Sequence, residues 1–230
     1  MIESKFQAVI FDMDGVVIDS RPDIEDFWQR LAASKGFHIT EEVMDDYIHG
    51  CPVWLTIEKV FPMLSKSEIA ALMELIHDME SKMSYHLVEG IRAMLMKLKT
   101  HEVPVALVTS GYIKKVSQVF EALDLTDFFQ QVVTADMVKL GKPHPEPFLM
   151  AAEKLAVDSE RCVVFEDSVS GISGAVSAGM LPIGIIKESR QQALKSVGAQ
   201  WVVPDFKAVD FVKNDSDNYL SINQSNVIAF

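Results

Sequence analysis

The sequence contains little cysteine: only Cys51 and Cys162 occur among 230 residues. They are far apart in the chain, and neither has a Cys or His neighbour at metal-ligand spacing. A disulfide scaffold and a structural zinc site are therefore both unexpected. We predict two free thiols in a reducing compartment.

Basic residues are also scarce. The chain has 21 Lys and Arg against 33 Asp and Glu, which gives a net charge of −12 and an isoelectric point near 4.9. A nucleic-acid or anionic-membrane surface needs clustered basic side chains, so we expect neither partner. A small phosphorylated molecule remains compatible, because one divalent cation, one Lys and a few backbone N–H groups suffice to bind phosphate.

Long apolar runs are missing. No segment reaches membrane-spanning length, and residues 1–5 are not followed by an apolar region typical of a signal peptide. We therefore expect a cytoplasmic protein. The composition, 49% hydrophobic and 23% charged, is that of a globular chain with room for a sizeable core.

Short apolar segments do recur, and helical patterns lie between most of them. The apolar segments predict buried parallel strands. Strands that alternate with helices predict a doubly wound, mainly parallel α/β sheet, which binds ligands at the carboxyl ends of its strands. The predicted strands are 7–11, 103–108, 131–133, 161–165, 182–186 and 200–203, and the predicted helices are 113–123, 146–155, 169–178 and 190–197.

The stretch from about residue 20 to residue 85 interrupts this alternation with helical patterns alone. Pro22 suits the first turn of one helix, and Ser65 to Glu68 (SKSE) has the spacing of a capping box for another. We predict a helical cap domain at 19–87, inserted into a core formed by 1–18 and 88–213. The polar segment 214–230 is expected to be a loosely held C-terminal tail.

Asp12 and Asp14 follow the first predicted strand directly. Residues i and i+2 of an extended segment share a face, so both carboxylates can enter one site. Alone, such a pair is more often two solvated turn residues. Thr109 and Ser110 follow the second predicted strand, where hydroxyls and a helix start can hold a phosphate or simply cap the helix.

Lys142 lies in a Gly-Lys-Pro-His-Pro turn, which suits an ammonium that neutralises a phosphoryl group, although a surface-loop lysine is the alternative. Glu166 and Asp167 end another predicted strand. Two buried carboxylates near two more are costly unless a cation lies among them, and hard oxygen ligands suit magnesium. The alternative for this pair is an acidic helix N-terminus.

In combination, these motifs resemble the haloacid-dehalogenase superfamily. The order is Asp12-x-Asp14, Thr109, Lys142 within GKPxP, and Glu166-Asp167. The resemblance covers the chain from about residue 6 to residue 204 and implies a HAD-like Rossmannoid core, with the helical insertion as its cap. The sequence is similar to the branch that contains beta-phosphoglucomutase and phosphoglycolate phosphatase.

By this resemblance, Asp12 is the nucleophile that forms an aspartyl-phosphate, and Asp14 is the acid that protonates the leaving oxygen and then the base that activates water. Thr109, Ser110 and Lys142 would hold the phosphoryl oxygens. The implied cofactor is Mg²⁺. Its ligands would be the Asp12 carboxylate, the Asp14 main-chain carbonyl and Asp167, with Glu166 as a direct or an outer ligand.

The resemblance thus implies a magnesium-dependent phosphatase that hydrolyses a small phosphorylated metabolite, from a monomer or weak homo-oligomer. The alternatives are a phosphomutase and a catalytically idle relative that regulates. A beta-phosphoglucomutase anchors a second phosphate with an Arg three residues beyond a cap glycine and carries a His soon after the first motif. Here Val53 and Ile24 stand at those positions, which favours the phosphatase, although Arg21, Arg30 or Lys59 could replace the anchor.

Overall fold

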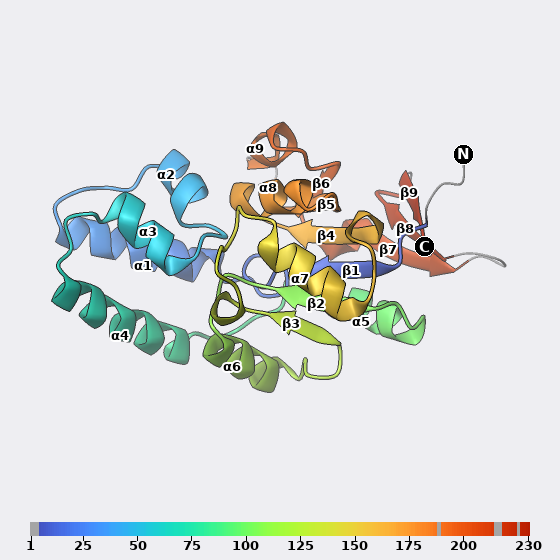
Figure 1. Ribbon diagram of the computed structural model, residues 1–230, viewed down its shortest axis with the longest axis horizontal. Coiled ribbons are helices and arrows are strands. Elements are labelled where there is room, and N and C mark those ends of the chain that lie inside the picture. The colour runs from blue at the N-terminus through green and yellow to red at the C-terminus, as the bar shows by residue number, and fades with distance from the viewer. Residues whose placement is uncertain (1–4, 188–189, 214–217, 225) are drawn as a thin grey trace.

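The computed structural model describes residues 5–187, 190–213, 218–224 and 226–230. Its centre is a six-stranded parallel sheet with the strand order β3-β2-β1-β4-β5-β6 (Figure 1). Each strand lies within two residues of a predicted one at both ends, so the predicted doubly wound α/β fold is confirmed. The strands are β1 Ala8–Phe11, β2 Val105–Val108, β3 Gln131–Val133, β4 Cys162–Glu166, β5 Leu181–Ile185 and β6 Trp201–Val203.

Helices cover both faces of this sheet, because alternate residues of each strand point to opposite sides. Val9 and Phe11 of β1 face α5 (Ile91–Thr100) and α6 (Ile113–Leu123). Ala8 and Ile10 face α7 (Glu146–Leu155) and α8 (Val169–Ser177). The short helix α9 is Gln191–Ser196, and the 3-10 turns are η1 Ala135–Met137, η2 Ser159–Arg161 and η4 Phe206–Ala208.

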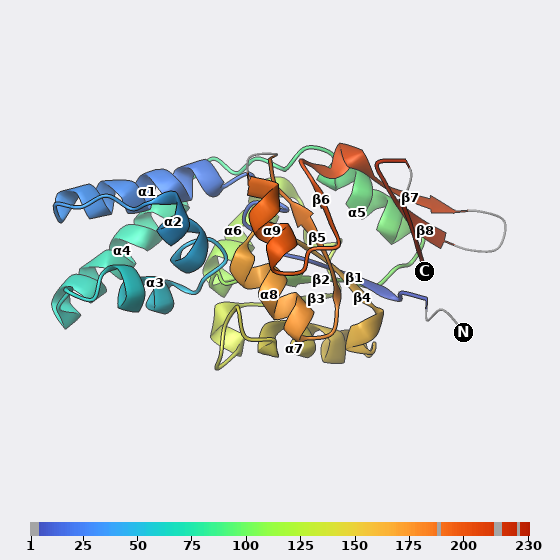
Figure 2. The same cartoon turned by 90° about the horizontal axis from the view of Figure 1, so that it is seen from above.

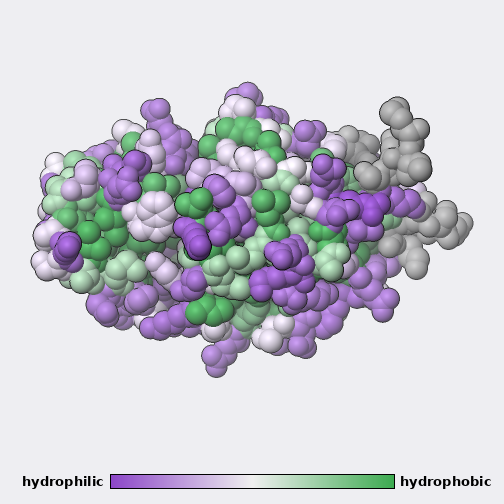
Figure 3. Space-filling view, viewed as in Figure 1, coloured by the Kyte–Doolittle hydropathy of each residue, from purple (hydrophilic) through white to green (hydrophobic). Residues whose placement is uncertain are grey.

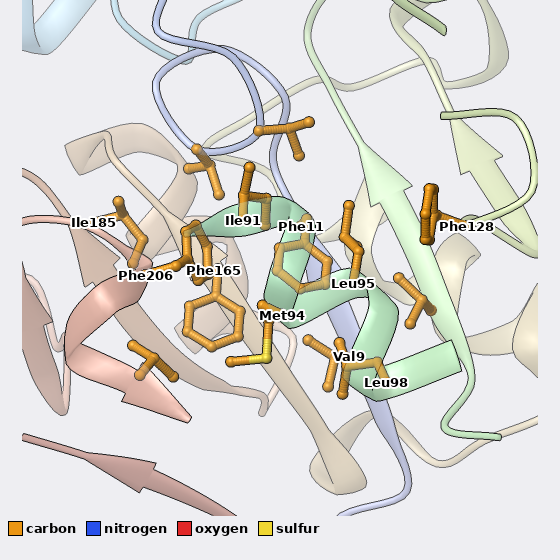
Figure 4. Packing of buried hydrophobic residues seen from close by; sticks show 14 of the residues in the cluster. Val9, Phe11, Ile91, Met94, Leu95, Leu98, Phe128, Phe165, Ile185 and Phe206 are labelled. Carbon is orange, nitrogen blue, oxygen red and sulfur yellow. The ribbon is translucent and has the colours of Figure 1, made fainter. Parts of the chain in front are cut away.

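Aromatic and aliphatic side chains fill the space between the sheet and α5 (Figure 4). Phe11 stacks on Phe165 of the neighbouring strand with 5.1 Å between ring centroids, and Phe206 contacts both rings. Leu95 of α5 belongs to the same cluster. This packing holds the ends of β1 and β4 side by side, and those ends lead into the predicted catalytic motifs.

Four helices lie at one end of the molecule, away from the sheet (Figures 1 and 2). They pack around a hydrophobic cluster of their own, in which Trp28, Phe61 and Leu72 are buried. Pro22 lies in the first turn of the first helix, and the predicted capping box of Ser65 and Glu68 is present. The helices are α1 Arg21–Ser34, α2 Glu41–Tyr47, α3 Val53–Val60 and α4 Lys66–Lys82.

The two connections between these helices and the sheet pair with each other. The N–H of Val88 donates to the carbonyl of Val17 over 3.1 Å, and the N–H of Asp19 donates to the carbonyl of His86 over 2.9 Å. A bend in one connection therefore carries the other with it. On this basis we propose that 19–87 moves as a cap over a core of 1–18 and 88–213.

The prediction of a loosely held tail after residue 213 is wrong for the part that the structure describes. Strands β7 (Val209–Lys213), β8 (Asn218–Ile222) and β9 (Asn226–Ala229) form an antiparallel sheet. Leu220 and Ile222 are fully buried in the cluster that contains α5. These apolar residues alternate with polar ones, so the polar average of the segment concealed a strand pattern. Residues 214–217 and 225 of the predicted tail lie outside the described residues.

Cys51 and Cys162 are free thiols, as predicted, and both are buried. On the face of the molecule shown in Figure 3, hydrophilic and hydrophobic residues are interspersed. Within the described ranges, no helix is sufficiently long and apolar to cross a membrane.

Candidate active site

Three neighbouring strands bring the predicted motifs to one edge of the sheet. Strand β1 lies between β2 and β4. The carboxyl ends of these strands are therefore adjacent, and each is followed directly by one of the predicted site residues: Asp12, Thr109 and Asp167. The N–H of Asp12 donates to the carbonyl of Phe165 over 3.0 Å, which extends the parallel pairing into the motif. The sheet register therefore sets the separation of these side chains.

The ammonium of Lys142 lies between two carboxylates. Its Nζ is 2.5 Å from Asp12 Oδ1 and 2.6 Å from Glu166 Oε1, and it donates to the Val108 carbonyl over 3.1 Å. Burial acts to lower the pKa of Lys142, but the two carboxylates outweigh this effect and raise the pKa. Burial also raises the pKa of Asp12 well above its usual value, although Lys142 opposes that shift.

Both oxygens of the Glu166 carboxylate are engaged within the protein. Oε1 accepts from Lys142, while Oε2 accepts from the N–H and the hydroxyl of Ser168, each over 2.8 Å. Gly171 lies against this carboxylate, since a Cβ there would be 1.8 Å from Oε1. Of the two roles predicted for Glu166, this geometry favours the indirect one, in which Glu166 fixes Lys142.

Asp167 is buried beside the turn that follows Asp14. Its Oδ2 lies 2.5 Å from Nη1 of Arg21, and burial raises the pKa of Asp167 against the effect of Arg21. Gly15 has φ +81°, and a Cβ at this position would be 2.1 Å from Asp167 Oδ2. Only glycine lets the backbone after Asp14 approach this carboxylate so closely.

The oxygen groups near Gly15 and Asp167 are of the kind that binds magnesium. Mg²⁺ is typically held by one or two carboxylates together with water and substrate phosphate. The described residues contain no cluster of three or more His, Cys, Asp or Glu side chains that could hold a metal. The ligands that the resemblance implies, the Asp12 and Asp167 carboxylates and the Asp14 carbonyl, would include two carboxylates, a number that fits magnesium.

The carboxylate of Asp14 is held by two donors that the sequence motifs did not include. Its Oδ1 accepts from the Ser20 hydroxyl over 2.5 Å and from Lys115 Nζ over 2.7 Å. Lys115 is buried, and although burial acts to lower its pKa, the charges of Asp14 and Glu80 raise it. The sequence offered one sign of Lys115: it is a lysine among the residues of α6 that are buried, next to Val116.

The two predicted phosphate-binding hydroxyls differ in their surroundings. Thr109 is buried, and its Oγ1 accepts from the N–H of Gly111 over 2.9 Å. Among the described residues it donates to no acceptor, so its hydroxyl hydrogen can serve a ligand. Ser110 instead donates to the carbonyl of Gly50 over 2.6 Å. That bond joins the sheet end to the inserted helical segment directly above the site.

A cavity of about 80 Å³ lies between the sheet end and the inserted helices. Trp28 and His49 of the inserted helical segment line this cavity, and both side chains are almost completely buried. Trp54 is half exposed and does not line it. The core wall includes Asp12, Asp14, Thr109 and Asp167, and the opposite wall includes Ile24 and Glu80.

A buried Asp12 in contact with a buried Lys142, with Asp14 two residues further on, is the arrangement that the resemblance implied. Residues 9–185 match the family model for haloacid dehalogenase-like hydrolases. The chain belongs to this family.

Individual relatives agree with this membership. A phosphorylated carbohydrates phosphatase of Thermotoga maritima is 33% identical over 90% of this chain and 98% of its own length. Hexitol phosphatase A of Escherichia coli is 31% identical over 78% of this chain and 82% of its own length. Among solved structures, a putative beta-phosphoglucomutase from Bacteroides vulgatus superposes with a TM-score of 0.74 at 28% identity, over 87% of this chain and 84% of its own.

Proposed function

We propose that the protein is a magnesium-dependent phosphatase that hydrolyses monophosphate esters of small carbohydrates through an aspartyl-phosphate. The observation that carries this proposal is the buried contact of Lys142 with Asp12, with Asp14 held separately two residues away. The similarity to relatives named as phosphatases of phosphorylated carbohydrates supports the substrate class.

Asp12 is oriented for attack. Lys142 binds Oδ1, and no hydrogen bond to Oδ2 from the described residues is present, so that oxygen is open to phosphorus. In the first step Oδ2 forms a bond to phosphorus while the bond from phosphorus to the ester oxygen breaks. The leaving oxygen takes its proton from Asp14.

In the second step a water oxygen attacks phosphorus, Asp14 accepts the water proton, and the bond between Asp12 and phosphorus breaks to release inorganic phosphate. Thr109 and Lys142 hold the phosphoryl oxygens during both steps. Asp12, Asp167 and the Asp14 carbonyl would hold Mg²⁺, which would supply positive charge that offsets repulsion between these carboxylates and the phosphate. The cap excludes bulk water while the ester is bound.

The charges around the cavity favour a phosphatase over a phosphomutase. A mutase needs a cation that can hold a second phosphate, but Arg21 is paired with Asp167, and Lys115 lies beside Asp14 and Glu80, whose negative charges repel a phosphate. Arg30 and Lys59, the other proposed anchors, are exposed and paired with neighbouring acids of their own helices. Neither lines the cavity.

The test is to incubate the purified protein and magnesium with p-nitrophenyl phosphate and with a panel of sugar and polyol phosphates, and to measure released phosphate. A second arm supplies beta-glucose 1-phosphate with glucose 1,6-bisphosphate and follows glucose 6-phosphate. Isomerisation with little phosphate release would establish the mutase instead.

That the protein is a monomer or weak homo-oligomer in the cytoplasm, without nucleic-acid or membrane partners, stays a prediction.

A further inference from the structure

Lys115 and Glu80 face each other across the cavity from different parts of the molecule. Lys115 belongs to α6 of the sheet region, and Glu80 belongs to α4 of the inserted helices, which packs on α6. Lys115 Nζ lies 3.9 Å from Glu80 Oε1, and the side chains are only 5% and 13% exposed. The hydroxyl of Tyr85 donates to the main-chain carbonyl of Glu80 over 2.7 Å, which fixes this end of α4.

The protein itself supplies only some of the hydrogen bonds that the Lys115 ammonium and the Glu80 carboxylate can make. An ammonium has three donors, and the acceptor within hydrogen-bond distance of Lys115 in the described part of the chain is Asp14 Oδ1. The Glu80 carboxylate has no hydrogen bond to any described residue, and 3.9 Å is too long for one with Lys115. Since unmade hydrogen bonds of buried charged groups are costly, a ligand that completes both would be bound well.

A hydroxyl group fits between them. The hydroxyl oxygen can lie about 2.8 Å from Lys115 Nζ and from Glu80 Oε1 at the same time. This is possible because the two hydrogen-bond lengths together exceed the 3.9 Å between those two atoms. It would accept from Lys115 and donate to Glu80. Lys115 also contacts Asp14, the acid for the leaving oxygen, so the hydroxyl would lie within a few ångströms of the ester oxygen and belong to the adjacent carbon.

On this geometry, and resting on the proposed function, we propose that Lys115 and Glu80 bind the hydroxyl next to the phosphate-bearing carbon and select uncharged polyhydroxy esters. Lys115 and Glu80 discriminate between substrates because their charges are opposite. An anionic group at this position is attracted by Lys115 but repelled by Glu80 and Asp14, and an ammonium is repelled by Lys115. Carboxylated esters are therefore poor substrates.

The experiment uses substrate pairs that differ in one group. Glycerol 1-phosphate has the adjacent hydroxyl, and 3-hydroxypropyl phosphate lacks it. In the second pair, 2-hydroxyethyl phosphate has a neutral CH₂OH where phosphoglycolate has a carboxylate. p-Nitrophenyl phosphate, which has no such hydroxyl, reports on the phosphoryl chemistry. For the unaltered enzyme with magnesium, kcat/KM should favour the first member of each pair at least about tenfold.

The variants are Lys115→Met and Glu80→Gln, with Lys114→Met as the matched control because Lys114 is an exposed neighbour on the same helix. The preference for glycerol 1-phosphate over 3-hydroxypropyl phosphate should fall to within about threefold of unity in both test variants and stay unchanged in the control. Glu80→Gln should also raise activity on phosphoglycolate relative to 2-hydroxyethyl phosphate. If Lys115→Met does not fold, as judged by circular dichroism, Glu80→Gln gives the same test.

Parallel loss on all substrates, with both preferences kept, would mean that Lys115 and Glu80 only position Asp14, and would overturn this inference. Hydrolysis of p-nitrophenyl phosphate combined with a preference for phosphoglycolate would also overturn it, while leaving the phosphatase intact. No hydrolysis of any ester would overturn the proposed function and this inference with it.

Discussion

Nζ of Lys142 lies 2.5 Å from Oδ1 of Asp12, and both side chains are almost completely buried. Because Glu166 holds the same ammonium from its other side, Lys142 cannot turn away from Asp12 without breaking a second ion pair. The charge that assists phosphoryl transfer is thus also part of the core. Activity and stability are linked at this residue.

Replacing Lys142 with Met should abolish turnover and lower the free energy of unfolding by about 3–5 kcal/mol, because two carboxylates lose their buried partner. Urea unfolding and p-nitrophenyl phosphate hydrolysis measure the two effects. The control is Lys139→Met, since Lys139 is exposed in the same loop. That variant should match the unaltered protein in both assays.

The double variant Lys142→Met/Glu166→Gln should regain part of the lost stability but no activity. The second substitution removes the charge of Glu166, one of the two carboxylates left without a partner. The phosphoryl group still lacks the Lys142 ammonium, so activity does not return. Equal stability of the single and double variants would show that the buried pairing of Lys142 with Glu166 contributes nothing to the fold.

Asp12→Asn should reduce turnover by at least about a thousandfold while the protein remains folded, because an amide fills the same volume but does not attack phosphorus. Steady-state phosphate release gives the rate. Mass spectrometry of acid-quenched enzyme should find a phosphoryl group on the Asp12 peptide of the unaltered protein and none in the variant. A phosphorylated peptide elsewhere would refute Asp12 as the nucleophile.

Much of the fold could be predicted because the strands are buried on both faces. The segment from Cys162 to Phe165 is apolar throughout, so its own composition suffices to recognise it as a buried strand. The bounds of α6 and α7 agree with the prediction at both ends, since strong helical periodicity and a proline start mark them. The strands β8 and β9 were missed because both are short and begin with Asn, and the polar residues around them gave the whole segment a polar average.

The site was predictable to the extent that its residues follow strands. Asp12, Thr109 and Asp167 are adjacent because β2, β1 and β4 are adjacent. Lys115 and Glu80 could not be predicted in this way. They come from helices that are neighbours only in the folded chain, and each is one of many charged helical residues in the sequence.

The capping box of α4 gives a pH-dependent prediction. Lys35 and Ser65 lower the pKa of the exposed Glu68 to about 2, from an ordinary value of 4.5. A carboxyl group whose pKa is lower in the folded protein stabilises above its unfolded pKa, and this contribution disappears as the pH falls toward the folded value. Glu68→Gln should therefore lower the Tm at pH 7, and the difference should shrink between pH 4.5 and pH 2.

Thermal unfolding at several pH values measures that difference. Glu74→Gln, at an exposed position of the same helix without the cap, is the control and should show no such trend. A Tm difference that stays constant down to the lowest pH would contradict the assigned role of Glu68.

Removal of magnesium should abolish activity, and its return should restore it. Asp12 and Asp167 both face the phosphate with like charge, so without a divalent cation the ester is repelled from the nucleophile. Calcium should bind but support turnover poorly, because its longer and less regular coordination misplaces phosphorus relative to Asp12. Phosphate release after EDTA treatment, with each cation added in turn, measures this. Full activity in EDTA would refute the metal site.

Calorimetric titration tests the ligands independently of turnover. Asp167→Asn should weaken magnesium binding at least about tenfold, because one of two carboxylate ligands is lost. The same substitution also loosens Arg21, which contacts Asp167 and, over 3.4 Å, Asp45. Asp45→Asn separates the two effects, since it disturbs Arg21 but leaves Asp12 and Asp167 in place. If Asp45→Asn weakened magnesium binding as much as Asp167→Asn, the affinity would depend on the placement of Arg21, and Asp167 would lose its assignment as a ligand.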